Sequence, residues 1–278
     1  MNNYVSFRNK IKVSGIIDFK TAFHIGSGES GNLASKMPIL RDYDNTPVLP
    51  GSTLKGNFRS TAEKLAEYFD MWACFFDLSL TNQNNKFCIG DEEYRNSNDT
   101  KNTLETLKKD KSSEKAIWDW INKNTCNVCK IFGSPMSASR VFFSDAQLED
   151  WAGNVLIRDG VCIDRDSETA VDKAKYDYEV VPKDARYTFT LEMQNCEDNE
   201  IALIAAVISE WENDFRIGGF TSRGLGKGKL TLDKVETLDY SDPEQLKDYL
   251  INKNMKQNKT FFNDRLELAL ANGGADNA

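Results

Sequence analysis

Two segments that combine glycine with basic residues are the parts of this sequence best suited to bind phosphate. The first basic segment runs from Pro50 to Arg59, and the second from Gly218 to Gly228. In the first, we expect Ser52 or Thr53 to cap a helix, whose N-terminal N–H groups and dipole attract anions. In the second, closely spaced glycines let the backbone approach a ligand. The alternative is a capped amphipathic helix and a flexible turn without a ligand.

The distribution of charge favours a nucleic-acid partner although the chain is acidic overall. The net charge is −8, but residues 51–60, 120–144 and 218–230 contain basic residues and no acids. These basic residues are Lys55, Arg59, Lys123, Lys130, Arg140, Arg223, Lys227 and Lys229. Phosphate binding depends on local positive charge, so these stretches predict a basic stripe on a polar molecule.

Six cysteines include a pair with metal-ligand spacing. Cys126 and Cys129 are separated by two residues, which lets both thiolates reach one tetrahedral zinc ion. We expect Cys74 and Cys88 to complete a structural zinc site, because a polar insertion of this size has little core of its own. The alternative is four buried thiols. Cys162 and Cys196, which we associate with predicted strands, are expected to be packing residues.

The chain has 278 residues, of which 40% are hydrophobic and 28% charged. The periodicity of the hydrophobic residues predicts the helices and strands that must position the basic segments and the cysteines. The patterns predict strands at 10–25, 139–144, 155–163, 186–194 and 228–238, and helices at 53–70, 114–122 and 200–215. Residues 241–278 predict a tail with one or two charged helices. This order indicates an α+β, ferredoxin-like βαββαβ core carrying insertions, whose open sheet face can meet RNA. No apolar run reaches membrane-spanning length and no signal peptide is recognisable, so we expect a cytoplasmic protein without a membrane partner.

An ordered set of motifs resembles the RAMP superfamily of CRISPR proteins, most closely the backbone subunit of type III effector complexes. The motifs are His24–Gly28, Pro38–Asp42, Pro50–Arg59, Cys126–Gly133, Ser139–Ala146, Arg158–Arg165, Glu179–Pro182 and Gly218–Lys227. The resemblance covers about residues 10–235. It implies a domain at 1–240, an insertion at about 74–130, a β-hairpin thumb at about 155–185 and a helical tail at 241–278.

The resemblance also implies a function. Several copies would stack along a guide CRISPR RNA, and target RNA would pair with the exposed bases in a complex with other CRISPR effector subunits. Sequence is then read by base pairing, so the protein needs only phosphate contacts and shape. The residues expected to contact RNA are Lys36, Ser52, Lys55, Arg59, Arg140, Gly219, Ser222, Arg223 and Lys227.

One position bears on whether the chain cleaves RNA. In cleaving members of the family, an Asp stands two residues before the proline of the Pro38–Asp42 motif, and here that residue is Lys36. A lysine cannot supply a carboxylate, so we expect a subunit that binds RNA without cutting it. The alternatives are a metal-dependent endoribonuclease using another carboxylate and a zinc-stabilised subunit that caps the filament and binds mainly protein. His24, the sole histidine, is expected to end a strand rather than to act as a base or ligand.

Overall fold

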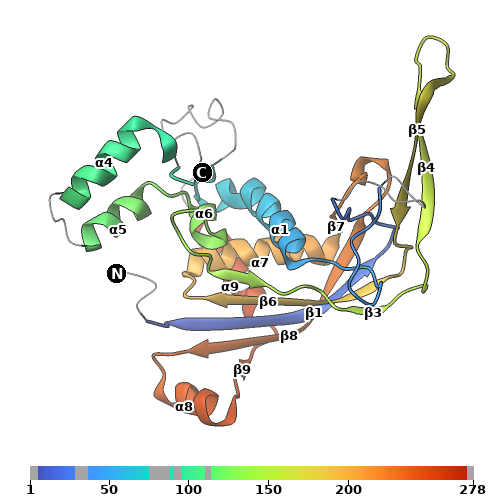
Figure 1. Ribbon diagram of the computed structural model, residues 1–278. Coiled ribbons are helices and arrows are strands. Elements are labelled where there is room, and N and C mark those ends of the chain that lie inside the picture. The colour runs from blue at the N-terminus through green and yellow to red at the C-terminus, as the bar shows by residue number, and fades with distance from the viewer. Residues whose placement is uncertain (1–5, 29–36, 75–87, 91–94, 110–113, 274–278) are drawn as a thin grey trace.

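The computed structural model describes residues 6–28, 37–74, 88–90, 95–109 and 114–273. Within these residues the centre of the molecule is a seven-stranded sheet, and a separate two-stranded hairpin projects at one end (Figure 1). The sheet contains β1 (Asn9–Phe19), β2 (Val141–Phe143), β3 (Leu148–Asp150), β6 (Arg186–Gln194), β7 (Phe215–Arg216), β8 (Lys227–Asp239) and β9 (Lys256–Gln257). The hairpin consists of β4 (Leu156–Ile163) and β5 (Ala170–Val180).

The strand order of the sheet is β2-β6-β1-β8-β7, with β3 paired to β6 and β9 paired to β8. All of these pairs are antiparallel. Strands β6 and β8 follow the predicted ranges 186–194 and 228–238 closely, whereas β1 ends at Phe19, six residues before the predicted end. Buried residues alternate with less buried ones along β1 and β6. The fold mixes helices with antiparallel sheets, in agreement with the expected α+β class.

Two helices bury one face of the sheet. Helix α1 (Gly51–Leu65) and helix α7 (Asp198–Asn213) lie on the same side of the strands in Figure 1. Helix α1 presents Leu54, Phe58 and Ala62 to the core, at the helical spacing seen in the sequence. The Phe58 ring lies 4.5 Å, centroid to centroid, from Trp211 of α7. This packing fixes where the first basic segment lies relative to the sheet.

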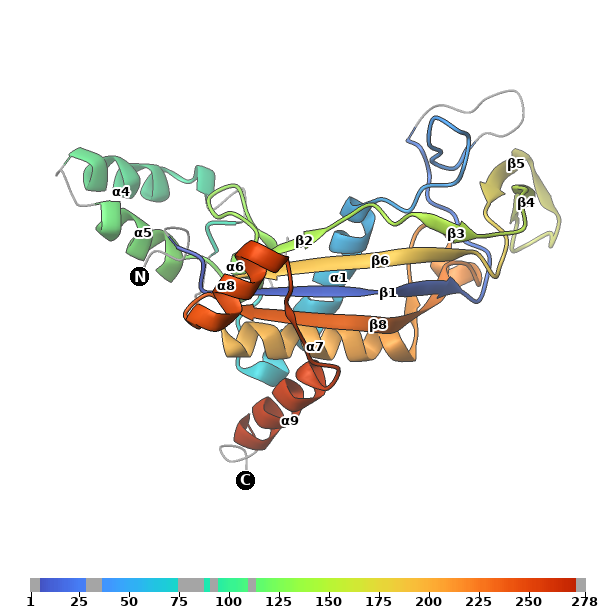
Figure 2. The same ribbon diagram turned by 90° about the horizontal axis from the view of Figure 1, so that it is seen from below.

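The insertion contains more helix than its polar sequence predicts. Helix α5 (Glu114–Lys123) confirms the single helix expected near this position. Helices α4 (Asn98–Lys109) and α6 (Asn127–Phe132) were not predicted. Both views place α4 and α5 at the end of the molecule opposite the β4–β5 hairpin (Figures 1 and 2).

The C-terminal segment adds two helices to the domain, as the sequence predicts. Helix α8 (Pro243–Asn252) is capped by Asp242 and follows β8 directly, and helix α9 (Phe261–Gly273) packs against α7 (Figure 2). Single turns of 3-10 helix occur at Ala66–Phe69 and Thr221–Arg223. Among the described residues, none of the helices has the length and apolar character needed to cross a membrane.

Candidate metal centre and nucleic-acid interface

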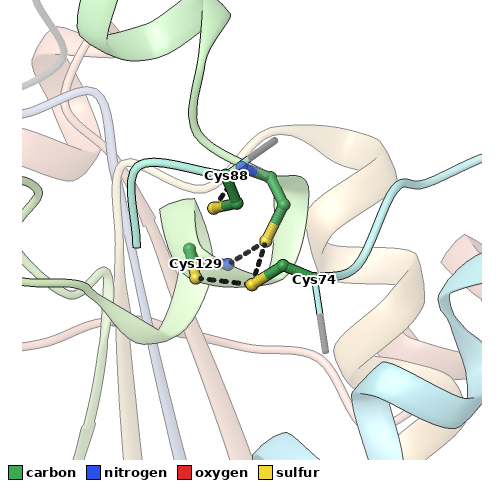
Figure 3. Close-up of side chains that lie close together, drawn as sticks. Cys74, Cys88 and Cys129 are labelled. Carbon is green, nitrogen blue, oxygen red and sulfur yellow. Dashed lines mark hydrogen bonds between the residues drawn. The ribbon is translucent and has the colours of Figure 1, made fainter. Parts of the chain in front are cut away.

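Four cysteine sulfurs converge in the described part of the chain, as the sequence predicts. The Sγ atoms of Cys74, Cys88, Cys126 and Cys129 all lie within 4.8 Å of one another. Cys74 Sγ is 3.5 Å from both Cys126 Sγ and Cys129 Sγ. Four thiolates around a tetrahedral zinc ion at about 2.3 Å are separated by about 3.8 Å, so the spacing suits a metal. Figure 3 shows the labelled side chains of Cys74, Cys88 and Cys129 pointing toward a common point.

Backbone N–H groups already point at these sulfurs. Gly90 N donates to Cys88 Sγ at 3.3 Å, and Cys126 N donates to the same sulfur at 3.2 Å. Cys129 N donates to Cys126 Sγ at 3.2 Å, which places that sulfur at the N-cap of α6. A Cβ atom on Gly90 would lie 2.7 Å from Cys129 Sγ, so a side chain there would push into the cluster. N–H donors stabilise sulfur in the thiolate form, which is the form that binds metals.

The mutual hydrogen bonds also separate the thiol pKa values. The Cys126 thiol, followed by those of Cys129 and Cys74, lowers the pKa of Cys88 below the usual range. The hydrogen bonds with the Cys126 and Cys129 thiols, together with burial, raise the pKa of Cys74 above the usual range. Four sulfur donors at this spacing can hold a soft divalent ion.

Arg59 contacts this cluster, and its side chain is partly buried. Its Nη2 lies 3.2 Å from Cys129 Sγ, its Nη1 lies 3.4 Å from the Gly133 oxygen, and its Nε lies 2.8 Å from Glu63 Oε1. Burial works to lower the pKa of Arg59, but the Glu63 carboxylate and the Cys129 sulfur raise it above the usual range. The expectation that Arg59 faces a bound phosphate does not match this position.

The rest of the first basic segment is also engaged with the protein. Helix α1 begins at Gly51, and Pro50 is its N-cap without a side-chain hydrogen bond, so the predicted cap at Ser52 or Thr53 is wrong. The Asp145 carboxylate accepts the Gly51 N–H at 2.6 Å, which brings an acid to the position proposed for an anion. Ser52 is exposed beside it.

Lys55 lies one turn along the same helix and is only partly buried. Its Nζ donates to Ser139 Oγ at 3.0 Å. Burial lowers the pKa of the Lys55 ammonium, and the nearby positive charge of Arg59 lowers it further. An anion placed against Lys55 would offset both effects, so this side chain still suits a phosphate.

The glycines of the second basic segment are required by contacts within the protein. Gly218 and Gly226 have φ values of 88° and 73°, in the left-handed region that favours glycine. A Cβ atom on Gly218 would lie 2.3 Å from the His24 oxygen, and one on Gly226 would lie 2.0 Å from the Ile217 oxygen. Gly219 donates its N–H to the His24 oxygen at 2.8 Å. The turn is thus a tightly folded element and not a flexible loop.

Side chains of this turn point outward beside the base of the β4–β5 hairpin. Ser222 and Arg223 are exposed, and the Arg223 guanidinium lies 5.6 Å from the centre of the Phe220 ring. Its Nη1 donates to the Tyr176 hydroxyl of β5. Phe220 stacks on Tyr178 with ring centroids 4.4 Å apart. Arg223 also lines an open groove of about 580 Å³ with Arg165 and residues of both hairpin strands.

Lys227 stands at the start of β8, near the end of the same turn. Its Nζ forms an ion pair with the Asp214 carboxylate at 3.0 Å, and both side chains are about two-fifths exposed. The pair leaves the ammonium partly accessible, so Lys227 can reach a phosphate.

Two further predicted RNA contacts are Arg140, which is buried, and Lys36, which the structure does not describe. The Arg140 side chain is 6% exposed and forms a buried ion pair with Glu200 of α7, so it is not available to a surface ligand. Sequence reasoning placed it in an acid-free stretch because Glu200 is remote along the chain. Lys36 lies outside the residues that the structure describes.

Two side chains support the second basic segment from behind. His24 is buried, and its Nδ1 lies 2.7 Å from the Glu179 oxygen. The expectation that His24 ends a strand is wrong, because β1 ends at Phe19. The Glu179 carboxylate accepts the Ile39 N–H at 3.0 Å and pairs with Arg41 at 3.1 Å. Only the position of Glu179 at the end of a predicted hairpin could have pointed to it.

The remaining cysteines differ from each other. Cys196 is buried, as expected of a packing residue, and burial raises its pKa to about 12. Cys162 is exposed on β4, so the prediction that it packs in the core is wrong. The hairpin strand that carries Cys162 stands away from the sheet and has no core to enter.

Comparison with known proteins identifies a matching family and a similar protein. The RAMP superfamily profile matches residues 16–229. A protein from Enterococcus italicus (strain DSM 15952 / CCUG 50447 / LMG 22039 / TP 1.5), named CRISPR system Cms endoribonuclease Csm3, is 26% identical to this chain over 235 residues. That alignment covers 83% of this chain and 94% of the relative.

Proposed function

This chain belongs to the RAMP superfamily, and from that premise we propose that it is a backbone subunit of a CRISPR effector ribonucleoprotein. The observation that carries the proposal is the family match, because it spans both basic segments and the β4–β5 hairpin. The name of the Enterococcus relative, which assigns that protein to a CRISPR system, supports the same conclusion.

In this proposal the second basic segment is the main contact to guide CRISPR RNA. Gly219, Ser222, Arg223 and Lys227 hold the RNA backbone, with Ser52 and Lys55 of α1 as further contacts. Arg223 lies against Phe220 and Tyr176, so an arginine fixed on aromatic rings meets the RNA at the base of the hairpin. The hairpin acts as the thumb of the family. Further copies of the chain would stack along the guide, and target RNA would pair with its exposed bases.

The core of the proposed fold is ferredoxin-like. Its elements follow one another as β1, α1, β2, β6, α7 and β8, and the order of the four strands across the sheet is β8-β1-β6-β2. This arrangement supports a βαββαβ unit in which the insertion and the hairpin interrupt the chain. The cytoplasmic location expected from the sequence stays a prediction.

We further propose that the four cysteines hold a structural zinc ion. Zn²⁺ prefers four sulfur donors in a closed tetrahedral site, and it would hold residues 74 and 88 against α6. Its binding energy would stabilise the insertion, since the ion joins segments that are distant in sequence.

The RNA contacts are tested by charge reversal. Arg223→Glu and Lys55→Glu together should weaken binding of single-stranded RNA and flatten its salt dependence by about one log–log unit for each lost phosphate contact. Sequence preference should not change. Arg265→Glu on α9 is the matched control, because Arg265 pairs with Asp198 away from both segments. An unchanged salt slope in the double variant would refute the proposed interface.

We propose that the subunit does not cut the target itself, because Lys36 stands where cleaving relatives have an Asp. The name of the Enterococcus relative, which calls that protein an endoribonuclease, favours a second candidate function for this chain, cleavage of target RNA. In this alternative the reaction depends on a metal ion held by another carboxylate. The two are separated by incubating complexes of the chain and guide with labelled target RNA and magnesium. Cleavage by the unaltered chain would establish the second function. Cleavage only after Lys36→Asp would support the first, since a carboxylate is what a hydrolytic metal site requires.

A further inference from the structure

We infer that Arg59 is the partly buried counter-charge of the four-cysteine centre and not a contact to RNA. The inference rests on the proposed metal site and assigns it a fifth residue, contributed by helix α1 and not by the insertion. The inference also assigns different partners to Lys55 and Arg59, which lie one turn apart on the same helix. Arg59 faces the metal centre, and Lys55 is available to RNA.

Each of the three guanidinium nitrogens of Arg59 has a partner within the protein. Its three nitrogens meet three different acceptors, namely Cys129 Sγ at 3.2 Å, the Gly133 oxygen at 3.4 Å and Glu63 Oε1 at 2.8 Å. The side chain is 28% exposed. These contacts turn one edge of the guanidinium toward the cysteine cluster and Glu63, whereas Arg223 is an exposed residue.

Electrostatics explains why a cation is needed at this position. A zinc ion with four thiolates carries a net charge of −2, and the four cysteines are buried. A buried charge is costly unless it is paired and hydrogen-bonded. Arg59 is the arginine in contact with a cysteine sulfur among the described residues. Its planar fork can serve Cys129 and Glu63 at once, and it does not lose its proton near neutral pH.

The position of Gly133 strengthens the assignment. Gly133 ends α6, the helix that carries Cys129, and its oxygen accepts the second guanidinium N–H. Arg59 therefore binds both the sulfur and the end of the helix that presents it. Lys55, one turn earlier, donates to the Ser139 hydroxyl oxygen instead of a sulfur. The counter-charge is thus specific to Arg59.

The test measures metal affinity in the full-length chain. Zinc is titrated against a chromophoric chelator, and Co²⁺ is bound to report the thiolates spectroscopically. Arg59→Gln should weaken zinc binding about 10- to 100-fold, the usual effect of losing a group that supports a metal ligand. Loss of the N–H bond to Cys129 should move the thiolate-to-cobalt charge-transfer band to lower energy. Arg59→Lys keeps the charge and should recover much of the affinity.

The matched control is Lys64→Gln, which removes a positive charge from an exposed residue of the same helix. It should leave the zinc affinity and the cobalt spectrum unchanged. In metal-loaded protein, Arg59→Gln should also keep the salt slope of RNA binding, whereas Arg223→Gln should flatten it by about one unit.

The outcomes distinguish this inference from the proposed function. If the unaltered chain binds no zinc, the metal centre fails and the inference fails with it. If the unaltered chain binds zinc but Arg59→Gln binds it equally well with an unchanged cobalt spectrum, only the inference is overturned. It is likewise overturned if metal-loaded Arg59→Gln flattens the salt slope of RNA binding. Should Arg59→Gln not fold, the shift of the cobalt band and the affinity in Arg59→Lys decide the question.

Discussion

The two basic segments look alike in sequence but face opposite environments. In the first, Gly51 donates to Asp145, Lys55 donates to Ser139, and Arg59 contacts the cysteine cluster. In the second, Ser222 and Arg223 remain exposed at the base of the β4–β5 hairpin. The glycines of the two segments also differ. A Cβ atom on Gly56 would meet no atom within 4 Å, whereas one on Gly226 would lie 2.0 Å from the Ile217 oxygen.

The difference shows that the presence of basic residues and glycines in a motif does not determine which partner those residues contact. The first segment opens a helix that packs on the sheet, so its polar groups meet partners contributed by the insertion and by the strand that follows it. The second segment is a turn between β7 and β8. Its backbone makes contacts within the protein, while the side chains of Ser222 and Arg223 remain exposed. We therefore expect the first segment to respond mainly to the metal centre and the second to RNA.

The largest expected effect comes from removing a cysteine beside the first segment. Cys126→Ser should abolish stoichiometric zinc and lower the free energy of unfolding by more than about 4 kcal/mol, because loss of a structural metal is among the most destabilising changes. Metal analysis and thermal unfolding with and without chelator measure this. Cys162→Ser, on the exposed hairpin, should change stability by less than about 0.5 kcal/mol. If the unfolding temperature of the unaltered chain does not change when chelator is added, the first segment does not lie beside a structural metal centre, and the proposed contrast between the segments is wrong.

The next effect tests whether the second segment is a rigid turn. Gly226→Ala should cost about 2 to 3 kcal/mol of folding free energy, because the backbone is left-handed and the new Cβ would lie 2.0 Å from the Ile217 oxygen. Gly224→Ala is the matched control, since Gly224 has φ 87° but nothing within 4 Å, and it should cost about 1 kcal/mol. Denaturant unfolding measures both. If the two substitutions lower the free energy of unfolding equally, the close contact with the Ile217 oxygen is not the reason that glycine is required at position 226.

Local periodicity and spacing predicted most of the architecture. Strands β1, β6 and β8 alternate in burial over most of their length, and the apolar residues of α1 recur at helical spacing, so both signals are visible in the sequence. The cysteine pair at 126 and 129 likewise indicates its chemistry by spacing alone. Helix α4 was missed because its sequence is largely polar and few apolar residues mark a face.

The orientation of individual basic residues could not be predicted, because their partners are distant in sequence. Arg140 meets Glu200 sixty residues away, and Arg59 meets Cys129 seventy residues away. The acid at the start of α1 is Asp145, ninety-four residues beyond Gly51. A stretch free of acids in one dimension is thus not free of them in three.

A smaller effect is expected at Gly56, which is exposed in the interior of α1. Gly56→Ala should raise the free energy of unfolding by about 0.5 to 1 kcal/mol, because alanine loses less backbone entropy in a helix and the new Cβ meets no atom within 4 Å. The salt slope of RNA binding should stay the same. If the substitution stabilises the chain but weakens RNA binding tenfold, RNA packs closely against Gly56 itself, and the first segment contributes more to RNA binding than we propose.

The smallest expected effect is a gain of RNA affinity in the second segment. The Lys227 ammonium pairs with the Asp214 carboxylate at 3.0 Å, and both side chains are about two-fifths exposed. Solvent-exposed pairs contribute about 0.2 to 1 kcal/mol. Asp214→Asn should free the ammonium and remove a negative charge near the phosphates, so RNA binding should tighten by up to about fivefold at moderate salt. The backbone N–H of residue 214 still reaches the Glu210 oxygen, so the end of α7 is preserved. Asp233→Asn on β8 changes the net charge equally, and binding assays on the two variants separate a local effect from a global one. Equal tightening in both would mean that the RNA senses only the overall charge of the protein, and that Lys227 does not contact it.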